Sequence, residues 1–242
     1  MKRVKVNWNL IKGIAIVAIL IFLYAFSANR NATRVIENPD IKFLEREQDF
    51  ITRAMVNKLL IQNDDSVTNV RKEQLDLDVL EERLRANEMI QDAEVYLSVN
   101  GTLGAKIKQR TPIARIATKD SYYIDSEGKA MPLSSVSAAR VPFVEGKVDK
   151  KELKNIYVLA KYIAKDDFLK KNVISIVQNK NKTFNLKLRT NDFVVLFGNI
   201  KNIEMKVNNL KAFYKKATKD KTLNDYAKVD LKFTNQVVCT KK

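Results

Sequence analysis

The sequence predicts an α+β protein: an apolar N-terminal helix, a small domain with two helices on one face of a sheet, and a strand-rich second domain with flanking helices. Three observations support this fold class. Residues 14–26 contain no charge and no proline. Between residues 75 and 115, leucines at helical spacing give way to strict apolar alternation. Further along, short alternating segments recur between two longer amphipathic stretches.

The apolar run is long enough to cross a bilayer as a helix. Residues 11–28 would rise about 27 Å, close to the roughly 30 Å of a hydrocarbon core. Lys2, Arg3 and Lys5 precede the run, and positive flanking charges keep that end of a membrane helix in the cytoplasm. We therefore expect a single-pass anchor with the rest of the chain outside the cytoplasm.

A cleavable signal peptide is the alternative interpretation of the same run. Ala25 and Ser27 are small residues at the spacing that a signal peptidase requires. The length of the run and the nearby Arg30 and Arg34 favour an anchor. Both interpretations place the bulk of the chain outside the cytoplasm.

Composition excludes several classes of site. The chain has no histidine and one cysteine, Cys239, which rules out an internal disulfide, metal sites built on His or paired Cys, and Ser-His-Asp or Cys-His catalysis. We expect no catalytic residue, no metal and no cofactor. The net charge of +16 suits acidic partners, but a secretory N-terminus removes the chain from most nucleic acid, so no nucleic-acid partner is expected.

The first domain opens with a short strand and a helix. Residues 41–43 alternate as in a strand, and the apolar positions between 45 and 60 fall on one side of a helix. The polar stretch 63–66 then breaks that helix.

A second helix follows, with two candidate N-terminal caps. Leu77, Leu80 and Leu84 form a stripe at helical spacing. Asp78 followed by Glu81 has the spacing of a capping box, and Asp76 is a competing N-cap.

A hairpin completes the first domain. Ala93, Val95, Leu97 and Val99 alternate, Asn100 and Gly101 signal a tight turn, and the return strand carries Leu103, Ala105 and Ile107. The predicted order is strand, helix, helix, strand, strand.

The second domain is predicted to be rich in strands. Strands are expected over 113–117, 122–124, 174–177, 184–188 and 193–197. One helix is expected to begin at Asp149 and Glu152, and a second to cover 200–218. Val229, Leu231 and Phe233 alternate as in a last strand.

Several of these segments resemble the FtsQ/DivIB family of bacterial division proteins. Its POTRA domain is matched by residues 76–84 (DLDVLEERL), 93–95 (AEV), 101–103 (GTL) and 109–114 (QRTPIA), and its β domain by 123–125 (YID), Gly128, 141–142 (VP), Gly146 and 229–233 (VDLKF). Gln109 stands where the family usually has glutamate, Glu88 and Met89 stand where it often has Pro-Trp, and the first strand lacks the expected glycine. The expected division is a tail over 1–9, a transmembrane helix over 10–28, a linker over 29–36, a POTRA-like domain over 37–117 and an FtsQ-type β domain over 118–242.

The resemblance implies a non-enzymatic scaffold of the bacterial inner membrane at the division septum. Its partners would be FtsB-like and FtsL-like coiled-coil proteins, one of which adds a strand to the C-terminal edge of the sheet. Carrying the family's binding strand over by position gives Lys232, Phe233, Asn235, Val237 and Val238. Phe233 would be the aromatic anchor and Lys232 a charge partner for an acidic segment.

Each of these assignments has a simpler structural alternative. Phe233, Val237 and Val238 would also suit a β core, and Lys232 a solvated surface. Glu94, Gln109, Arg110 and Arg115 form a second expected contact set, with a solvated sheet face as the alternative.

Other functions also fit parts of the sequence. The basic stretch 200–218 could touch lipid headgroups or wall polymer, or simply be solvated. A POTRA-containing secretion or outer-membrane assembly factor that binds extended strands is the rival function, although no barrel-like run of strands follows.

Overall fold

The computed structural model describes residues 8–32, 39–44, 49–61, 75–98, 101–118, 120–146, 148, 153–233 and 236–242. Several residues named in the sequence predictions lie outside the described residues. They are the basic residues 2, 3 and 5, the break at 63–66, the strand end Val99, the turn residue Asn100, the helix-opening pair Asp149 and Glu152, and the binding candidate Asn235. The described residues form an N-terminal helix and two compact units.

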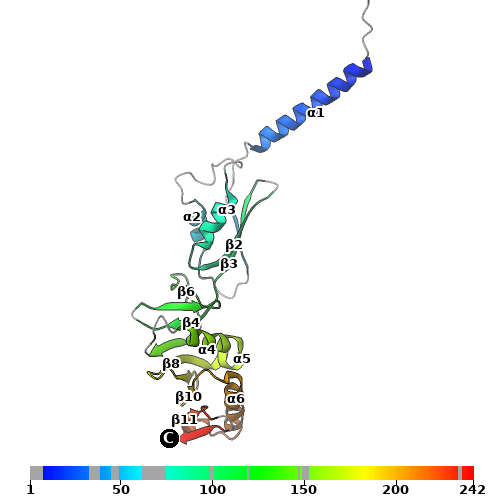
Figure 1. Cartoon of the computed structure of the whole chain (residues 1–242). Coiled ribbons are helices and arrows are strands. Elements are labelled where there is room, and N and C mark those ends of the chain that lie inside the picture. The colour runs from blue at the N-terminus through cyan, green and yellow to red at the C-terminus, as the bar shows by residue number, and fades with distance from the viewer. Residues whose placement is uncertain are drawn as a thin grey trace, which may run out of the picture. The chain divides into compact units, whose positions relative to one another are not determined.

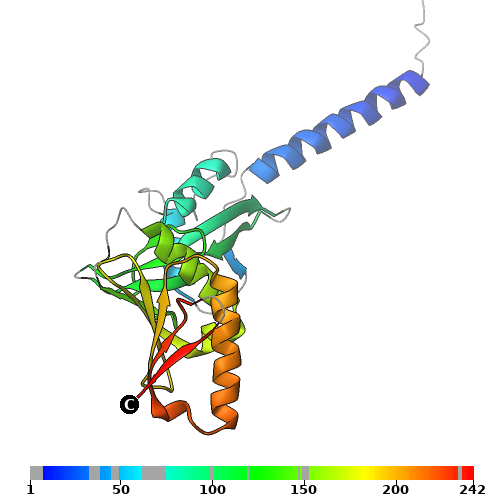
Figure 2. The same ribbon diagram turned by 60° about the horizontal axis from the view of Figure 1, so that its bottom comes forward.

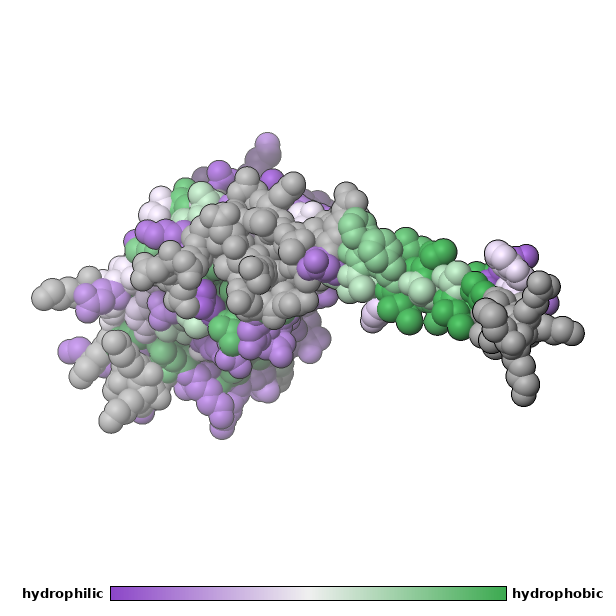
Figure 3. All heavy atoms as spheres, turned by 90° about the horizontal axis from the view of Figure 1, so that it is seen from above, coloured by the Kyte–Doolittle hydropathy of each residue, from purple (hydrophilic) through white to green (hydrophobic). Residues whose placement is uncertain are grey.

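The N-terminal helix α1 (Trp8–Ala32) confirms the predicted apolar helix. Its segment Ile11–Asn29 has a mean hydropathy of 2.3 and is not covered by other parts of the protein. At 1.5 Å per residue this segment is about 28 Å long, enough to cross a bilayer. Figure 3 shows hydrophobic residues along the visible face of this helix.

The first unit has the predicted order of strand, helix, helix, strand, strand. Its elements are β1 (Asp40–Leu44), α2 (Arg53–Ile61), α3 (Leu77–Arg85), β2 (Ile90–Leu97) and β3 (Leu103–Gln109) (Figure 1). The sheet order is β1-β3-β2, with β1 parallel to β3. Side chains of both helices and all three strands are buried together in this unit, among them Ile41, Val56, Leu60, Leu80, Leu84, Val95 and Ala105.

The structure resolves the competing caps of α3 in favour of Asp76. One carboxylate oxygen of Asp76 accepts the N–H groups of Asp78 (3.1 Å) and Val79 (3.2 Å), as an N-cap does. Glu81 caps nothing: it accepts the backbone N–H of Val95 in β2 at 2.7 Å.

The helix expected from residue 45 begins only at Arg53. Thr52 closes its first turn, with its hydroxyl accepting the N–H of Met55 at 3.2 Å. Phe50 and Ile51, expected on the helix, instead donate their N–H groups to Gln109. The apolar spacing of these two residues therefore reflects burial without helical structure.

The second unit is built on a nine-stranded mixed sheet of order β12-β11-β10-β9-β8-β7-β4-β5-β6. Its strands are β4 (Pro112–Ile116), β5 (Tyr122–Asp125), β6 (Ala130–Met131), β7 (Phe143–Gly146), β8 (Val173–Gln178), β9 (Phe184–Leu188), β10 (Val194–Gly198), β11 (Tyr226–Asp230) and β12 (Val238–Lys241). Its helices are α4 (Leu153–Lys165), α5 (Asp167–Asn172) and α6 (Ile203–Lys219), with a short 3₁₀ turn at Leu223–Asp225. Because β4 pairs with β5 and β7, the segment after Pro112 belongs to this unit.

Helices cover one face of the large sheet. Ile176, Leu186, Val195 and Val229 point from neighbouring strands into one apolar core, which Ile156 and Leu159 of α4 and Leu210 of α6 complete. Figure 2 shows α6 running alongside the C-terminal strands. This packing fixes α6 beside β11 and β12.

Gln109 anchors a distant segment to the start of the second unit. It is only 8% exposed, and its Oε1 accepts the N–H groups of Phe50 (2.7 Å) and Ile51 (3.2 Å). The hydroxyl of Ser134 donates to the carbonyl of Phe50 at 2.6 Å, and that of Ser137 donates to the carbonyl of Asp49 at 3.0 Å.

Replacing Gln109 by alanine should destabilise the second unit. The change leaves two buried N–H groups without an acceptor, which should lower the free energy of unfolding by about 2–3 kcal/mol. Gln109→Glu, which keeps the acceptor oxygens, should lose less. Denaturant titration of the full-length chain in micelles measures the unfolding free energy of both variants, with Gln236→Ala, a change at an exposed residue, as the control. Equal stability of Gln109→Ala and wild type would contradict the anchoring role of Gln109.

An ion pair on the other face of the sheet makes stability depend on pH. Lys187 Nζ lies 2.9 Å from Glu145 Oε2, and Ser175 Oγ donates to Glu145 Oε1 at 3.1 Å. The hydrogen bond from Lys187, helped by that from Ser175, holds the pKa of Glu145 below its ordinary 4.5 against the effect of burial. Since the folded-state pKa is the lower one, the stabilisation is fully present above pH 4.5 and is lost as pH falls through the folded-state value.

Glu145→Gln should therefore lose less stability than wild type when the pH falls from about 6 to about 3. The difference should stay below about 1 kcal/mol because both side chains are more than a third exposed. Denaturant midpoints across this pH range test the expectation, with Asp120→Asn in an exposed loop as control. Identical pH profiles for Glu145→Gln and wild type would refute it.

Candidate partner-binding edge

The strand β12 forms one end of the nine-stranded sheet and pairs only with β11 among the described strands. It is antiparallel to β11, with Val229 opposite Cys239 and Asp230 opposite Val238. We call β12 together with residues 231–233, 236 and 237 the C-terminal edge. An edge strand presents backbone N–H and C=O groups that no neighbouring strand uses.

The register identifies backbone groups at the open side of β12. The N–H of Leu231 donates to the carbonyl of Leu196 in β10 at 3.0 Å. Successive residues of a strand direct their backbone groups to opposite sides, so the N–H and C=O of Asp230 point toward β12 and pair with those of Val238. Cys239 follows Val238 in β12, so its N–H and C=O point the other way, to the open side of the strand. Within the described residues, no side chain bonds to these two groups.

A groove runs between α6 and the C-terminal edge. Its volume is about 560 Å³, and its lining includes Ala212, Phe213, Lys216, Tyr226, Val237 and Cys239. The rings of Phe213 and Tyr226 meet edge to face, 5.3 Å apart. The groove is therefore partly aromatic, with the Lys216 side chain in its wall.

The structure places the expected binding residues around this edge. Phe233 is 48% exposed and Val238 is 39% exposed, whereas Val237 is half-buried, packs on the core and lines the groove. The β-core alternative thus fits Val237, while Phe233 and Val238 present apolar surface to solvent. Asn235 lies outside the described residues.

Lys232 is held in place by its neighbours. Its Nζ lies 3.0 Å from Asp230 Oδ2, and its N–H donates to Asp230 Oδ1 at 2.9 Å. Its aliphatic stem crosses Gly198, where a Cβ atom would come within 2.7 Å of Lys232 Cγ. Gly198 has a φ of +77°, so both its conformation and this close approach favour glycine.

The residues of the second expected contact set have different partners within their own units. Glu94 lies in the first unit, paired with Lys106 at 3.1 Å, while the other three belong to the second unit. Gln109 is buried, and Arg110 pairs with the buried Asp125 at 2.7 Å. Arg115 stacks on the ring of Phe143, 5.5 Å from its centroid. Gln109 and Arg110 therefore make internal contacts, and a contact of this set with a partner stays a prediction.

The sequence did not single out the groove or the place of Cys239 in it. Phe213 and Tyr226 are far apart in the sequence, and no local pattern links them.

The Cys239 side chain is neutral. Burial raises the pKa of its thiol, which keeps the side chain poorly nucleophilic. In the part of the chain that the structure describes, no three acidic or cysteine side chains converge on a metal-binding position.

Two family models match adjacent parts of the chain, and their boundaries follow the two units. A POTRA-like domain model matches residues 41–108. An FtsQ/DivIB, C-terminal related model matches residues 111–240, more than half of the chain. No curated protein matches the chain. With a POTRA-like domain followed by this sheet and its flanking helices, the chain belongs to the FtsQ/DivIB C-terminal related family.

Proposed function

We propose that the protein is a non-enzymatic scaffold of the bacterial division machinery that binds an FtsB-like or FtsL-like coiled-coil protein at its C-terminal edge. The observation that carries the proposal is the position of β12 at the end of the sheet, where no described side chain bonds to the Cys239 backbone and where Phe233 and Val238 are exposed. A partner segment in extended conformation would add a strand there.

Backbone pairing and side-chain contacts contribute differently to such binding. The added strand gains main-chain hydrogen bonds at any sequence, whereas specificity comes from side chains on alternate positions. Val237 and Cys239 lie on the groove side of the edge. Alternate residues of the partner strand would therefore face the groove, and a bulky apolar residue fits its aromatic lining.

The charge distribution favours an acidic partner. Residues 153–242 carry 20 Lys and Arg against 7 Asp and Glu, a net charge of +13 out of +16 for the whole chain. Complementary charge raises association rates and selects partners more than it adds affinity. Lys216 in the groove wall and Lys241 in β12 place this charge at the edge itself.

The proposed location follows from α1 and its flank. Lys2, Arg3 and Lys5 would hold the N-terminus in the cytoplasm, and α1 would span the inner membrane. Both folded units would then lie outside the cytoplasm, where septal wall is made. An anchor retained after export fits this role, since the partners are themselves membrane-bound.

Phe233→Ala should weaken partner binding by about tenfold or more, because an exposed aromatic at an interface is a typical anchor. The full-length chain in micelles is titrated with the extracytoplasmic segments of the FtsB-like and FtsL-like proteins of the same organism. The matched control is Phe143→Ala, which removes another exposed phenylalanine, on β7.

Equal losses in Phe233→Ala and Phe143→Ala would remove the site from the C-terminal edge. Absence of binding by the wild-type chain would overturn the scaffold proposal. Binding of unrelated extended peptides in its place would favour the assembly-factor function.

Filling the groove should also weaken the partner. Ala212 is exposed and lines the groove, so Ala212→Trp should occupy the space without disturbing the core. We expect at least about tenfold weaker binding with an unchanged unfolding midpoint. Lys215→Trp, exposed on the same helix but outside the groove lining, controls for bulk. Full affinity in Ala212→Trp would show that the partner does not enter the groove.

A further inference from the structure

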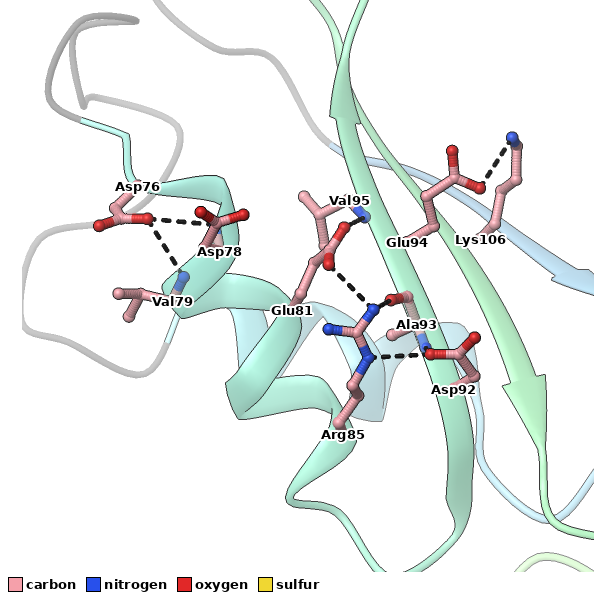
Figure 4. Close-up of polar contacts among 10 residues, drawn as sticks. All are labelled: Asp76, Asp78, Val79, Glu81, Arg85, Asp92, Ala93, Glu94, Val95 and Lys106. Atoms are coloured by element: carbon pink, nitrogen blue, oxygen red, sulfur yellow. Dashed lines mark hydrogen bonds and ion pairs between the residues drawn. The ribbon is translucent and has the colours of Figure 1, made fainter.

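The POTRA-like unit also has an edge strand, β2, but side chains bond to three of its backbone groups. β2 lies at the end of the three-stranded sheet, and α3 packs against it. Figure 4 shows side chains of α3 reaching the strand. The edge strands β2 and β12 therefore differ in whether a further strand finds free backbone groups to pair with.

Three side chains bond to backbone groups in the middle of β2. Glu81 Oε1 accepts the N–H of Val95 at 2.7 Å. Arg85 Nη2 donates to the carbonyl of Ala93 at 2.7 Å, and Asp92 Oδ1 accepts the N–H of Ala93 at 2.9 Å. Ala93 and Val95 are two residues apart, so these groups all point to the same side of the strand.

Ion pairs link these side chains to one another. Arg85 Nη2 lies 3.0 Å from Glu81 Oε2, and Arg85 Nε lies 2.8 Å from Asp92 Oδ1. Glu81 and Arg85 are one helical turn apart, which puts both on the face of α3 that meets β2.

We propose that Glu81, Arg85 and Asp92 form an edge guard that keeps a latent strand-accepting edge closed. The guard makes with β2 the hydrogen bonds that an incoming strand would make, so an extended peptide would have to break three of them to pair. Natural sheets protect their edges with charged side chains in this manner. The inference concerns β2 alone and holds whichever partner binds β12.

A packing role for the same contacts is the alternative. Under that reading, Glu81 and Arg85 fasten α3 to the sheet and have no effect on strand addition. The pair formed by Glu94 and Lys106 separates the two readings, because it joins β2 to β3 at 3.1 Å without bonding to these backbone groups (Figure 4).

The test uses a fluorescent synthetic peptide with the sequence of β2, Ile90–Leu97, and the full-length chain in micelles. The double variant Glu81→Leu, Arg85→Met removes the acceptor and the donor but keeps aliphatic bulk. It should bind the peptide at least about tenfold more tightly than wild type. Glu81→Gln, which retains an acceptor oxygen for Val95, and the double variant Glu94→Leu, Lys106→Met should bind as weakly as wild type.

Hydrogen exchange shows whether the guard has opened while the domain stays folded. In the Glu81→Leu, Arg85→Met variant, the Val95 amide should exchange at least about tenfold faster, while the amides of the buried Ala105 and Ile107 stay protected. If the Glu81→Leu, Arg85→Met variant keeps the Ala105 and Ile107 amides protected but binds the peptide no more tightly than wild type, the proposal is overturned. Tight peptide binding by the wild-type chain would overturn it equally.

The single variant Arg85→Met keeps the proposal testable if the double variant unfolds. It releases the Ala93 carbonyl and leaves the contact between Glu81 and Val95 in place. Tighter peptide binding than wild type supports the guard, and binding equal to wild type contradicts it.

Discussion

A backbone N–H or C=O at the edge of a sheet needs a hydrogen-bond partner, and the edge strands β2 and β12 meet this requirement differently. Water can always serve as the partner, but a strand whose edge is only hydrated stays open to any other extended chain. The POTRA-like unit meets the requirement internally, through Glu81, Arg85 and Asp92 on β2. In the nine-stranded sheet, no side chain of the described residues bonds to the backbone of Cys239 in β12. Of these two edges, β2 has side chains bonded to its backbone, and β12 carries the exposed Val238 with Phe233 close by in the chain.

The sequence predicted features that depend on neighbours close in the chain. The stripe of Leu80 and Leu84 and the alternation of Ala93 and Val95 both became buried faces of the predicted elements, because periodicity records which side of an element meets the core. The position of the last strand at a sheet edge was also expected, since it came from the order of elements in a related family.

Features that depend on distant segments could not be predicted in this way. Gln109 bonds to Phe50, 59 residues earlier, and Glu81 bonds to Val95, 14 residues later. A glutamine in an alternating strand and a glutamate at capping-box spacing look like surface residues until the fold brings in the other partner. The groove has the same origin: α6 and β12 each show an ordinary pattern, and only their packing places Phe213 beside Tyr226 and near Cys239.

The short length of β12 becomes understandable if its partner shares the membrane. A ladder along the four residues Val238–Lys241 offers few hydrogen bonds, each worth only about 0.5–1.5 kcal/mol net in water, so an isolated strand would bind weakly. When α1 and the partner's own helix lie in one bilayer, strand addition becomes nearly intramolecular, and effective concentrations reach roughly the millimolar range. A short open edge then suffices for the tethered partner, while free peptides at lower concentration stay unbound. The same tether raises the risk of pairing at any other exposed strand, which is the physical reason to keep β2 guarded.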